Sequence, residues 1–281
     1  MYVKYDKKEF SNYQEEAIKQ VFECSGYVFL TLVNSDSFLK TTSNESLIYR
    51  RNLGFDLGAF RDALGALRSK NVLQEVIFIN DSLFWSSKGI ESVLNQIKDF
   101  SSGVFFMTDS FQPFHHYQSY FFAAKGKNSI QEVSTWLNTC RNWRFKFSAI
   151  EFGELQNLKF FLNSPKVFFP QPELQQFAHN KFLLQENLNG RTKLRLDFCL
   201  KMKLRQAPLN PMHYYWRELI ELGLPGIKRD LLLQNPANIP DLDLDFLGQF
   251  NLTSLPKPAE VHSDIRKGSS FINVFRRKLR I

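Results

Sequence analysis

Short apolar runs alternate with amphipathic stretches through the first half of the chain, and this alternation constrains the fold more than any other feature. Runs with the length of buried strands occupy residues 27–33, 46–50, 76–80 and 103–108. Helical patterns occupy residues 10–23, 57–69 and 87–99. This strand–helix rhythm predicts an α/β protein with a mostly parallel central sheet flanked by helices.

The second half of the chain has a weaker pattern. We expect a helix over 129–140 and a short apolar run at 166–169, whereas 173–209 is polar, basic and without clear periodicity. From residue 210 the sequence NPMHYYWRELIELG provides an N-cap asparagine, a first-turn proline and a terminating glycine. We therefore divide the chain into a core at 1–170, a mainly helical part at 171–262 and a basic tail at 263–281.

Basic charge is concentrated at the end of the chain. The net charge is +8, of which the last sixteen residues contribute +6, leaving +2 for the rest. A body with so little net charge argues against a polybasic nucleic-acid binder. The three cysteines are isolated and lack zinc or disulfide spacing, which fits a reducing cytoplasm. The N-terminus lacks an apolar signal-peptide core, so we do not expect secretion.

Polar residues follow several of the expected strands. Ligands of parallel sheets bind outside the carboxyl ends of the strands, where Asp81, Asp109 and the loop after Arg50 are expected. In that loop, RRNLGFDLGAF combines a cation, an amide, a carboxylate and two glycines, which are the parts a sugar-nucleotide site needs. A tight strand-to-helix turn explains the same residues equally simply.

Asn80-Asp81-Ser82 ends the strand VIFIN, and a carboxylate there could hold a hard divalent cation together with substrate phosphates. A capped strand end is the alternative. Asp109 ends the next strand in the same way, with His115 and His116 nearby in an aromatic setting. Two carboxylates at neighbouring strand ends could divide the work between cation binding and general base catalysis.

Four segments in this order resemble the rhamnan synthesis protein F family of bacterial polysaccharide glycosyltransferases. They are RRNLGFDLGAF, VIFINDSLF, MTDS with HHYQSYFF, and NPMHYYWRELIELGLPGIKRDLLLQNP. The resemblance implies a GT-A-like, Rossmann-like core with a helical C-terminal part. It also implies transfer of rhamnose from dTDP-rhamnose onto a lipid-linked glycan such as an O-antigen or rhamnan.

The resemblance assigns roles to individual residues. The donor nucleotide-sugar site would comprise Arg51, Asn52, Gly54, Asp56, Gly58, Asn80, Asp81 and Ser82, with Asp81 as the ligand of a possible Mg²⁺ or Mn²⁺ ion. The acceptor side would comprise Thr108, Gln118, Ser119, His213, Trp216 and Lys228. Asp109 is the first choice for the catalytic base and His116 the second.

Three expectations complete this interpretation. The basic residues of 266–281, interleaved with apolar ones, predict peripheral association with anionic lipid at the cytoplasmic face of the bacterial plasma membrane. A UDP-hexose donor is an alternative, because fold does not fix the substrate. A non-catalytic glycan-binding module of a polysaccharide assembly complex is another.

Overall fold

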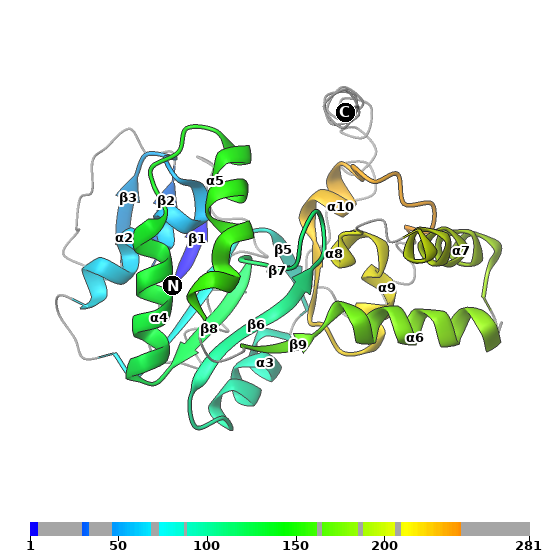
Figure 1. Ribbon diagram of the computed structural model, residues 1–281, viewed down its shortest axis with the longest axis horizontal. Coiled ribbons are helices and arrows are strands. Elements are labelled where there is room, and N and C mark those ends of the chain that lie inside the picture. The colour runs from blue at the N-terminus through cyan, green and yellow to red at the C-terminus, as the bar shows by residue number, and fades with distance from the viewer. Residues whose placement is uncertain are drawn as a thin grey trace. The chain divides into compact units, whose positions relative to one another are not determined.

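The computed structural model describes residues 1–4, 30–33, 47–68, 73–86, 89–161, 165–184, 188–205 and 209–242. These residues form two compact units, each described by itself (Figure 1). Unit 1 contains Met1–Asp81 and Ile90–Gln171. Unit 2 contains the described residues of Ser82–Gly89 and those from Pro172 to residue 242. The helix expected at 10–23 and the basic tail at 266–281 lie outside the described residues.

Unit 1 is built on one sheet. Its strands are β1 (Tyr2–Lys4), β2 (Leu30–Val33), β3 (Leu47–Arg50), β4 (Glu75–Asn80), β6 (Gly103–Ser110), β7 (His116–Tyr117), β8 (Phe121–Lys125) and β9 (Lys166–Phe169). They lie in the order β3-β2-β1-β4-β8-β6-β7, and β9 pairs with β6. Strands β1 to β4 pair in parallel, as do β6 and β9, whereas β8 runs antiparallel between β4 and β6.

The α/β class is therefore confirmed, but the sheet is mixed rather than mostly parallel. The difference arises at β8, whose sequence FFAAK is as apolar as a parallel strand and does not reveal its direction. Its neighbours β4 and β6 still run the same way, because each is antiparallel to β8. The carboxyl ends of β1, β2, β3, β4 and β6 consequently meet at one edge of the sheet, as the sequence predicts.

Helices cover the sheet of unit 1. They are α2 (Phe55–Arg68), α3 (Gly89–Lys98), α4 (Lys127–Thr139), α5 (Lys146–Phe152) and the 3-10 helix η1 (Glu154–Phe160). Helices α2 and α4 pack together on one face (Figure 1). There Phe60 of α2 meets Phe78 and Phe122 edge-on, and these two rings stack at 4.2 Å between centroids. This aromatic core positions β4, β8 and α2 relative to one another.

Unit 2 is mainly helical. Its elements are β5 (Leu83–Trp85), α6 (Gln171–Leu184), α7 (Gly190–Leu204), α8 (Pro211–Tyr214), α9 (Trp216–Glu221), β10 (Gly226–Lys228) and α10 (Arg229–Leu233). Strands β5 and β10 form an antiparallel pair. Asn210 caps α8 by accepting a hydrogen bond from the Met212 amide at 3.0 Å, with Pro211 in the first turn, as expected. The weakly patterned stretch 173–209 contains most of α6 and all of α7.

No helix within the described ranges is both long enough and apolar enough to cross a membrane.

Candidate functional site

Contacts of a buried arginine and close backbone packing fix the turn between β3 and α2. Arg50 is buried, donates to the carbonyl of Leu53 at 2.7 Å and pairs with Asp62 at 3.0 Å. Gly54 has φ +77°, and a Cβ atom there would lie 2.8 Å from the carbonyl oxygen of Arg141. A Cβ on Gly58 would lie 2.6 Å from the carbonyl oxygen of Leu53. Packing thus accounts for both glycines, and their place in a nucleotide pocket stays a prediction.

The polar side chains of this turn meet the end of β4. Asn80 is buried and donates to Asp56 in the first turn of α2, with 2.8 Å between Nδ2 and Oδ2. Asp81 follows Asn80 directly and is also buried. Arg51 is exposed and directly follows β3, whose carboxyl end lies at the same edge of the sheet. The Oδ1 atom of Asn52 is buried and has no hydrogen-bond partner among the described residues.

Strand register places the end of β6 beside this group. Phe78 of β4 and Phe106 of β6 lie opposite the same residue, Phe122 of β8. Asn80 and Thr108 are each two residues further on, and Asp81 and Asp109 each three. Two strand spacings separate the two strands, about 10 Å. The predicted donor and acceptor segments thus converge at one edge of unit 1.

Thr108 anchors a small buried network at the end of β6. Its hydroxyl donates to Oε1 of Gln118 at 2.6 Å and lies 2.9 Å from the hydroxyl of Tyr120. Burial raises the pKa of Tyr120, with the hydrogen bond to Thr108 opposing this effect, so the phenol stays protonated. Ser119 is held separately, because its amide and hydroxyl both donate to the Glu154 carboxylate, at 2.8 and 3.0 Å. Hydrogen bonds within unit 1 therefore explain why the polar side chains of Gln118 and Ser119 are buried.

Asp109 forms the second acidic position and is paired with His115. Its Oδ2 atom lies 2.9 Å from Nε2 of His115, and its Oδ1 accepts from the backbone amide of Gln171 at 2.7 Å. Asp109 has 6% of its side-chain surface exposed, against 35% for His115. The ring of Phe111 stacks on that of His115 at 4.4 Å between centroids. His115 is thus the solvent-accessible member of an ordered carboxylate–imidazole pair.

His116 has a different environment. Its side chain is buried, and Nδ1 lies 2.8 Å from the carbonyl oxygen of Phe114. The neighbouring Tyr117 lies opposite Asp109 in the β6–β7 pair, and burial and then the Asp109 charge raise the pKa of its phenol. Both histidines stand out in the sequence, but only His116 was predicted as an alternative base. Asp109 and His115 are six residues apart and joined by a loop. Their spacing in the sequence therefore did not indicate that they are in contact.

The remaining candidates lie in unit 2. His213 Nε2 contacts Asp230 at 3.1 Å, and burial lowers the pKa of this histidine. Trp216 is fully buried in the core of the unit, and Lys228 is the half-exposed N-cap of α10. The carbonyl of Ser82 accepts from the amide of Arg229 at 2.8 Å. Local packing explains Trp216, and the acceptor roles of His213, Trp216 and Lys228 stay predictions.

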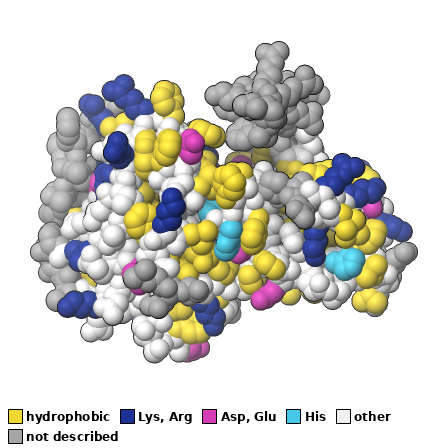
Figure 2. Space-filling view, viewed as in Figure 1, with side chains coloured by type: hydrophobic (Ala, Val, Ile, Leu, Met, Phe, Trp, Pro, Cys, Tyr) yellow, Lys and Arg dark blue, Asp and Glu magenta, His cyan; other side chains and the backbone are white. Residues whose placement is uncertain are grey.

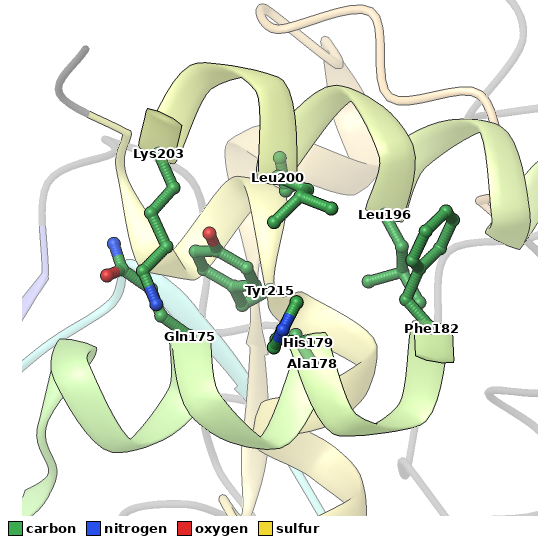
Figure 3. A pocket seen from close by; sticks show the side chains of 9 residues that line it. Gln175, Ala178, His179, Phe182, Leu196, Leu200, Lys203 and Tyr215 are labelled. Carbon is green, nitrogen blue, oxygen red and sulfur yellow. The ribbon is translucent and has the colours of Figure 1, made fainter. Parts of the chain in front are cut away.

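A pocket between α6 and α7 is too small for a substrate. Its volume is about 10 Å³, enough for a single water molecule. Figure 3 shows its lining, with His179 of α6 facing Leu200 of α7 and the ring of Tyr215 behind. The Nδ1 atom of His179 is buried and unpaired within the described part of the chain, so a bound water would satisfy it.

The side chains at the sheet edge determine how a metal ion could be held there. No group of three or more His, Cys, Asp or Glu that could hold a metal ion occurs among the described residues. A divalent cation near β4 would therefore take Asp81 as its carboxylate ligand and draw its other ligands from substrate phosphates and water, a pattern common for Mg²⁺.

The fold and these polar clusters define an α/β protein with a candidate ligand-binding edge. No family model matches the chain, and no solved structure matches it. The chain is similar to the virulence protein VirA of Vibrio anguillarum, with 26% identity over 259 residues, covering 84% of this chain and 79% of that protein. It is also similar to the uncharacterized protein y4gN of Sinorhizobium fredii, with 32% identity over 81 residues, covering 27% of this chain and 21% of that protein.

Proposed function

We propose that the chain is a GT-A-like glycosyltransferase that binds a nucleoside-diphosphate sugar at the carboxyl edge of unit 1. The sugar and acceptor follow from the family resemblance: rhamnose from dTDP-rhamnose, transferred to a lipid-linked bacterial glycan at the cytoplasmic membrane face. The relative in Vibrio anguillarum is named a virulence protein, which is compatible with a surface glycan product but names no reaction.

The strand order carries this proposal. The order β3-β2-β1-β4 is that of the first four strands of a doubly wound nucleotide-binding fold. In such folds the ligand lies where the strand order reverses, here between the carboxyl ends of β1 and β4. Asp81 directly follows β4, and the hydrogen-bonded pair Asp56–Asn80 lies beside it. This edge offers carboxylates and amides for ribose hydroxyls and for the polar groups of the base.

Charge is the main requirement for holding a diphosphate there. Asp56 and Asp81 would repel a donor carrying two phosphates unless a cation lies between them. Arg51 is exposed at the same edge and could supply one positive charge, whereas the guanidinium of Arg50 is engaged by Leu53 and Asp62. A Mg²⁺ or Mn²⁺ ion held by Asp81 would stabilise the leaving diphosphate as a Lewis acid when bound.

The Asp109–His115 pair could remove the proton from the acceptor hydroxyl. Asp109 is buried and both of its oxygens are engaged, so it is poorly placed to take a proton from a substrate directly. It can instead hold the Nε2–H tautomer of His115, leaving Nδ1 to accept the proton. The proposed base is therefore His115, and Asp109 is the residue that orients it.

Donor binding is tested by thermal shift with dTDP-, UDP- and GDP-sugars, each with and without Mn²⁺. We expect one nucleotide class to stabilise the protein, and Asp81→Asn to weaken that effect at least tenfold in apparent affinity. Glu75→Gln is the matched control, because Glu75 begins the same strand that Asp81 follows. Failure of every nucleotide to shift the melting temperature would indicate a non-catalytic glycan-binding module instead.

The base is tested by kinetics with saturating donor and acceptor. We expect His115→Gln to lower kcat by about 10²–10⁴-fold with little change in KM. His116→Gln is the control and should retain most of the turnover if the protein remains folded. A normal kcat in His115→Gln, or equal losses in both variants, would contradict the assignment.

A further inference from the structure

Helix α5 and its N-cap present three phenylalanines to solvent within eight residues. Phe145 is 73% exposed, Phe147 57% and Phe152 55%. Single exposed apolar side chains are common on proteins, but a cluster of large aromatic ones marks an interaction surface. This cluster lies in unit 1, on α5 and the residue that precedes it.

Basic side chains are interleaved with these rings. Arg141, Arg144 and Lys146 are all exposed, and the stretch RNWRFKF at 141–147 contains no acid. Glu151 is the acidic residue on α5 itself, and it is half-buried. Figure 2 shows Lys and Arg side chains beside hydrophobic ones over the region that α5 occupies in Figure 1. We call residues 141–152 the α5 surface.

Hydrogen bonds and packing attach the α5 surface to the rest of unit 1. Arg61 of α2 donates to the carbonyl of Cys140 at 2.5 Å and to the side chain of Asn142 at 2.7 Å. The carbonyl of Trp143 accepts from the amide of Gly54 at 2.8 Å. The ring of Trp143 packs inward against the core and stacks with Phe152 at 6.5 Å between centroids. Trp143 therefore anchors the segment, while Phe145 and Phe147 remain largely exposed.

The same contacts bring the α5 surface next to the candidate donor site. Gly54 belongs to the turn at the carboxyl end of β3, and Asp56 two residues later contacts Asn80 at the end of β4. A surface docked through Phe145 and Phe147 would consequently lie beside the edge where sugar transfer is proposed.

We propose that the α5 surface docks the protein onto an anionic lipid membrane. Phenylalanine inserts into the boundary between headgroups and acyl chains, and Lys and Arg are attracted to anionic headgroups. This combination fits a membrane surface better than an acidic protein partner, because large exposed rings lie among the exposed basic residues and an acidic surface alone would leave the rings without apolar contacts. The link to a lipid-linked acceptor rests on the proposed function, whereas lipid binding itself does not.

Vesicle flotation of the full chain tests the proposal, with phosphatidylcholine vesicles compared with vesicles containing 30% phosphatidylglycerol. We expect binding to the anionic vesicles that weakens with added salt. The double variant Arg144→Gln with Lys146→Gln should lower the partition constant about 30-fold, since each basic residue near anionic lipid contributes about 1 kcal/mol. Phe145→Ser with Phe147→Ser should lower it at least tenfold.

Two matched controls separate this surface from other basic regions. Arg191→Gln with Arg205→Gln removes the same charge from α7 and its C-cap, where both residues are exposed, and should leave binding nearly unchanged. Deleting 266–281 removes the basic tail. If the α5 variants bind anionic vesicles like the wild type, or if only the α7 variant or the tail deletion loses binding, the proposal is wrong.

A direct contact measurement guards against misfolding of the variants. Phe145→Trp places a fluorophore at the most exposed ring, and brominated lipid should quench its emission. Absence of additional quenching relative to wild type would overturn the proposal. Tighter binding of the α5 surface to single-stranded oligonucleotides than to anionic vesicles would also overturn it. Thermal shift with the donor nucleotide, carried out in parallel, shows whether the proposed function fails independently of lipid binding.

Discussion

At the residue scale, the turn after β3 depends on a backbone conformation that few residues adopt. Gly54 has φ +77° and lies against the carbonyl of Arg141, while Asp56 two residues later contacts Asn80. The position of the Asp56 carboxylate therefore depends on a glycine that need not touch a ligand. Sequence reasoning identified the segment but could not separate its packing glycines from its ligand-binding residues, because both uses favour a small side chain.

Replacing Gly54 tests this view. We expect Gly54→Ala to lower the free energy of unfolding by about 2–4 kcal/mol, from the left-handed conformation and the crowding against Arg141. Gly65→Ala, in the same helix-bearing segment, is the control, because a Cβ there meets nothing within 4 Å. It should stabilise the protein by about 0.5–1 kcal/mol. Equal effects in urea denaturation would contradict the packing role of Gly54.

His213 should make stability depend on pH. Burial lowers its pKa below the ordinary value of 6.5, with the hydrogen bond to Asp230 partly opposing this shift. The unfolded chain therefore takes up this proton at a higher pH than the folded protein does. Stability from this group is complete above pH 6.5 and is lost as the pH falls, by up to about 1.4 kcal/mol per pH unit.

Urea unfolding between pH 8 and 5 measures this effect. His213→Gln should flatten the loss of stability below pH 6.5 relative to the wild type. An unchanged pH profile in the variant would show that other groups cause the loss.

At the element scale, the apolar runs of the sequence predicted β2, β3, β4 and β6 of unit 1, whereas strands β1, β7 and β8 and the limits of two helices of unit 2 were not predicted. Strands β4 and β6 are continuous apolar runs because most of their residues are buried, whichever face of the sheet they point to. Helix α7 lacks such a signal, since its outer side carries Leu194, Phe198 and Leu204 among basic residues. Its start does have a local signal, because Asn189 caps it by accepting from the Thr192 amide at 2.8 Å. Strand β5 was missed because its partner β10 lies far along the chain.

A buried ionic network joins the elements of unit 2. Arg195 of α7 donates to both oxygens of Glu218 on α9, at 2.8 and 2.9 Å, and to Asp241 at 2.8 and 2.9 Å. All three side chains are almost completely buried. Burial lowers the pKa of Arg195, but the two carboxylates more than offset this and keep the guanidinium charged.

Removing the cation should destabilise unit 2 severely. Arg195→Met leaves two carboxylates buried without their partner, and we expect a loss of about 3–5 kcal/mol. The same substitution at the exposed Arg191 of α7 should change stability by less than about 0.5 kcal/mol. Comparable denaturation midpoints for the two variants would contradict a structural role of the network.

At the scale of the whole molecule, the sequence predicted which strand ends carry polar residues but not how these residues pair. Their common edge follows from strand direction alone. The pairing of Asp109 with His115 depends on the path of the loop after β6, and its second partner is the amide of Gln171, 62 residues away. Such contacts are set by tertiary structure and leave no local pattern. The antiparallel direction of β8 was missed for the same reason.

Amide hydrogen exchange with and without nucleotide tests the central claim most directly. The ligand is whichever of the dTDP-, UDP- or GDP-sugars gives the largest thermal shift, added at saturation. We expect slower exchange in peptides covering 47–58 and 76–81, which contain the turn after β3 and the end of β4, and no change in α7. Slower exchange confined to unit 2, or none in these two segments at saturating nucleotide, would contradict the proposed donor site.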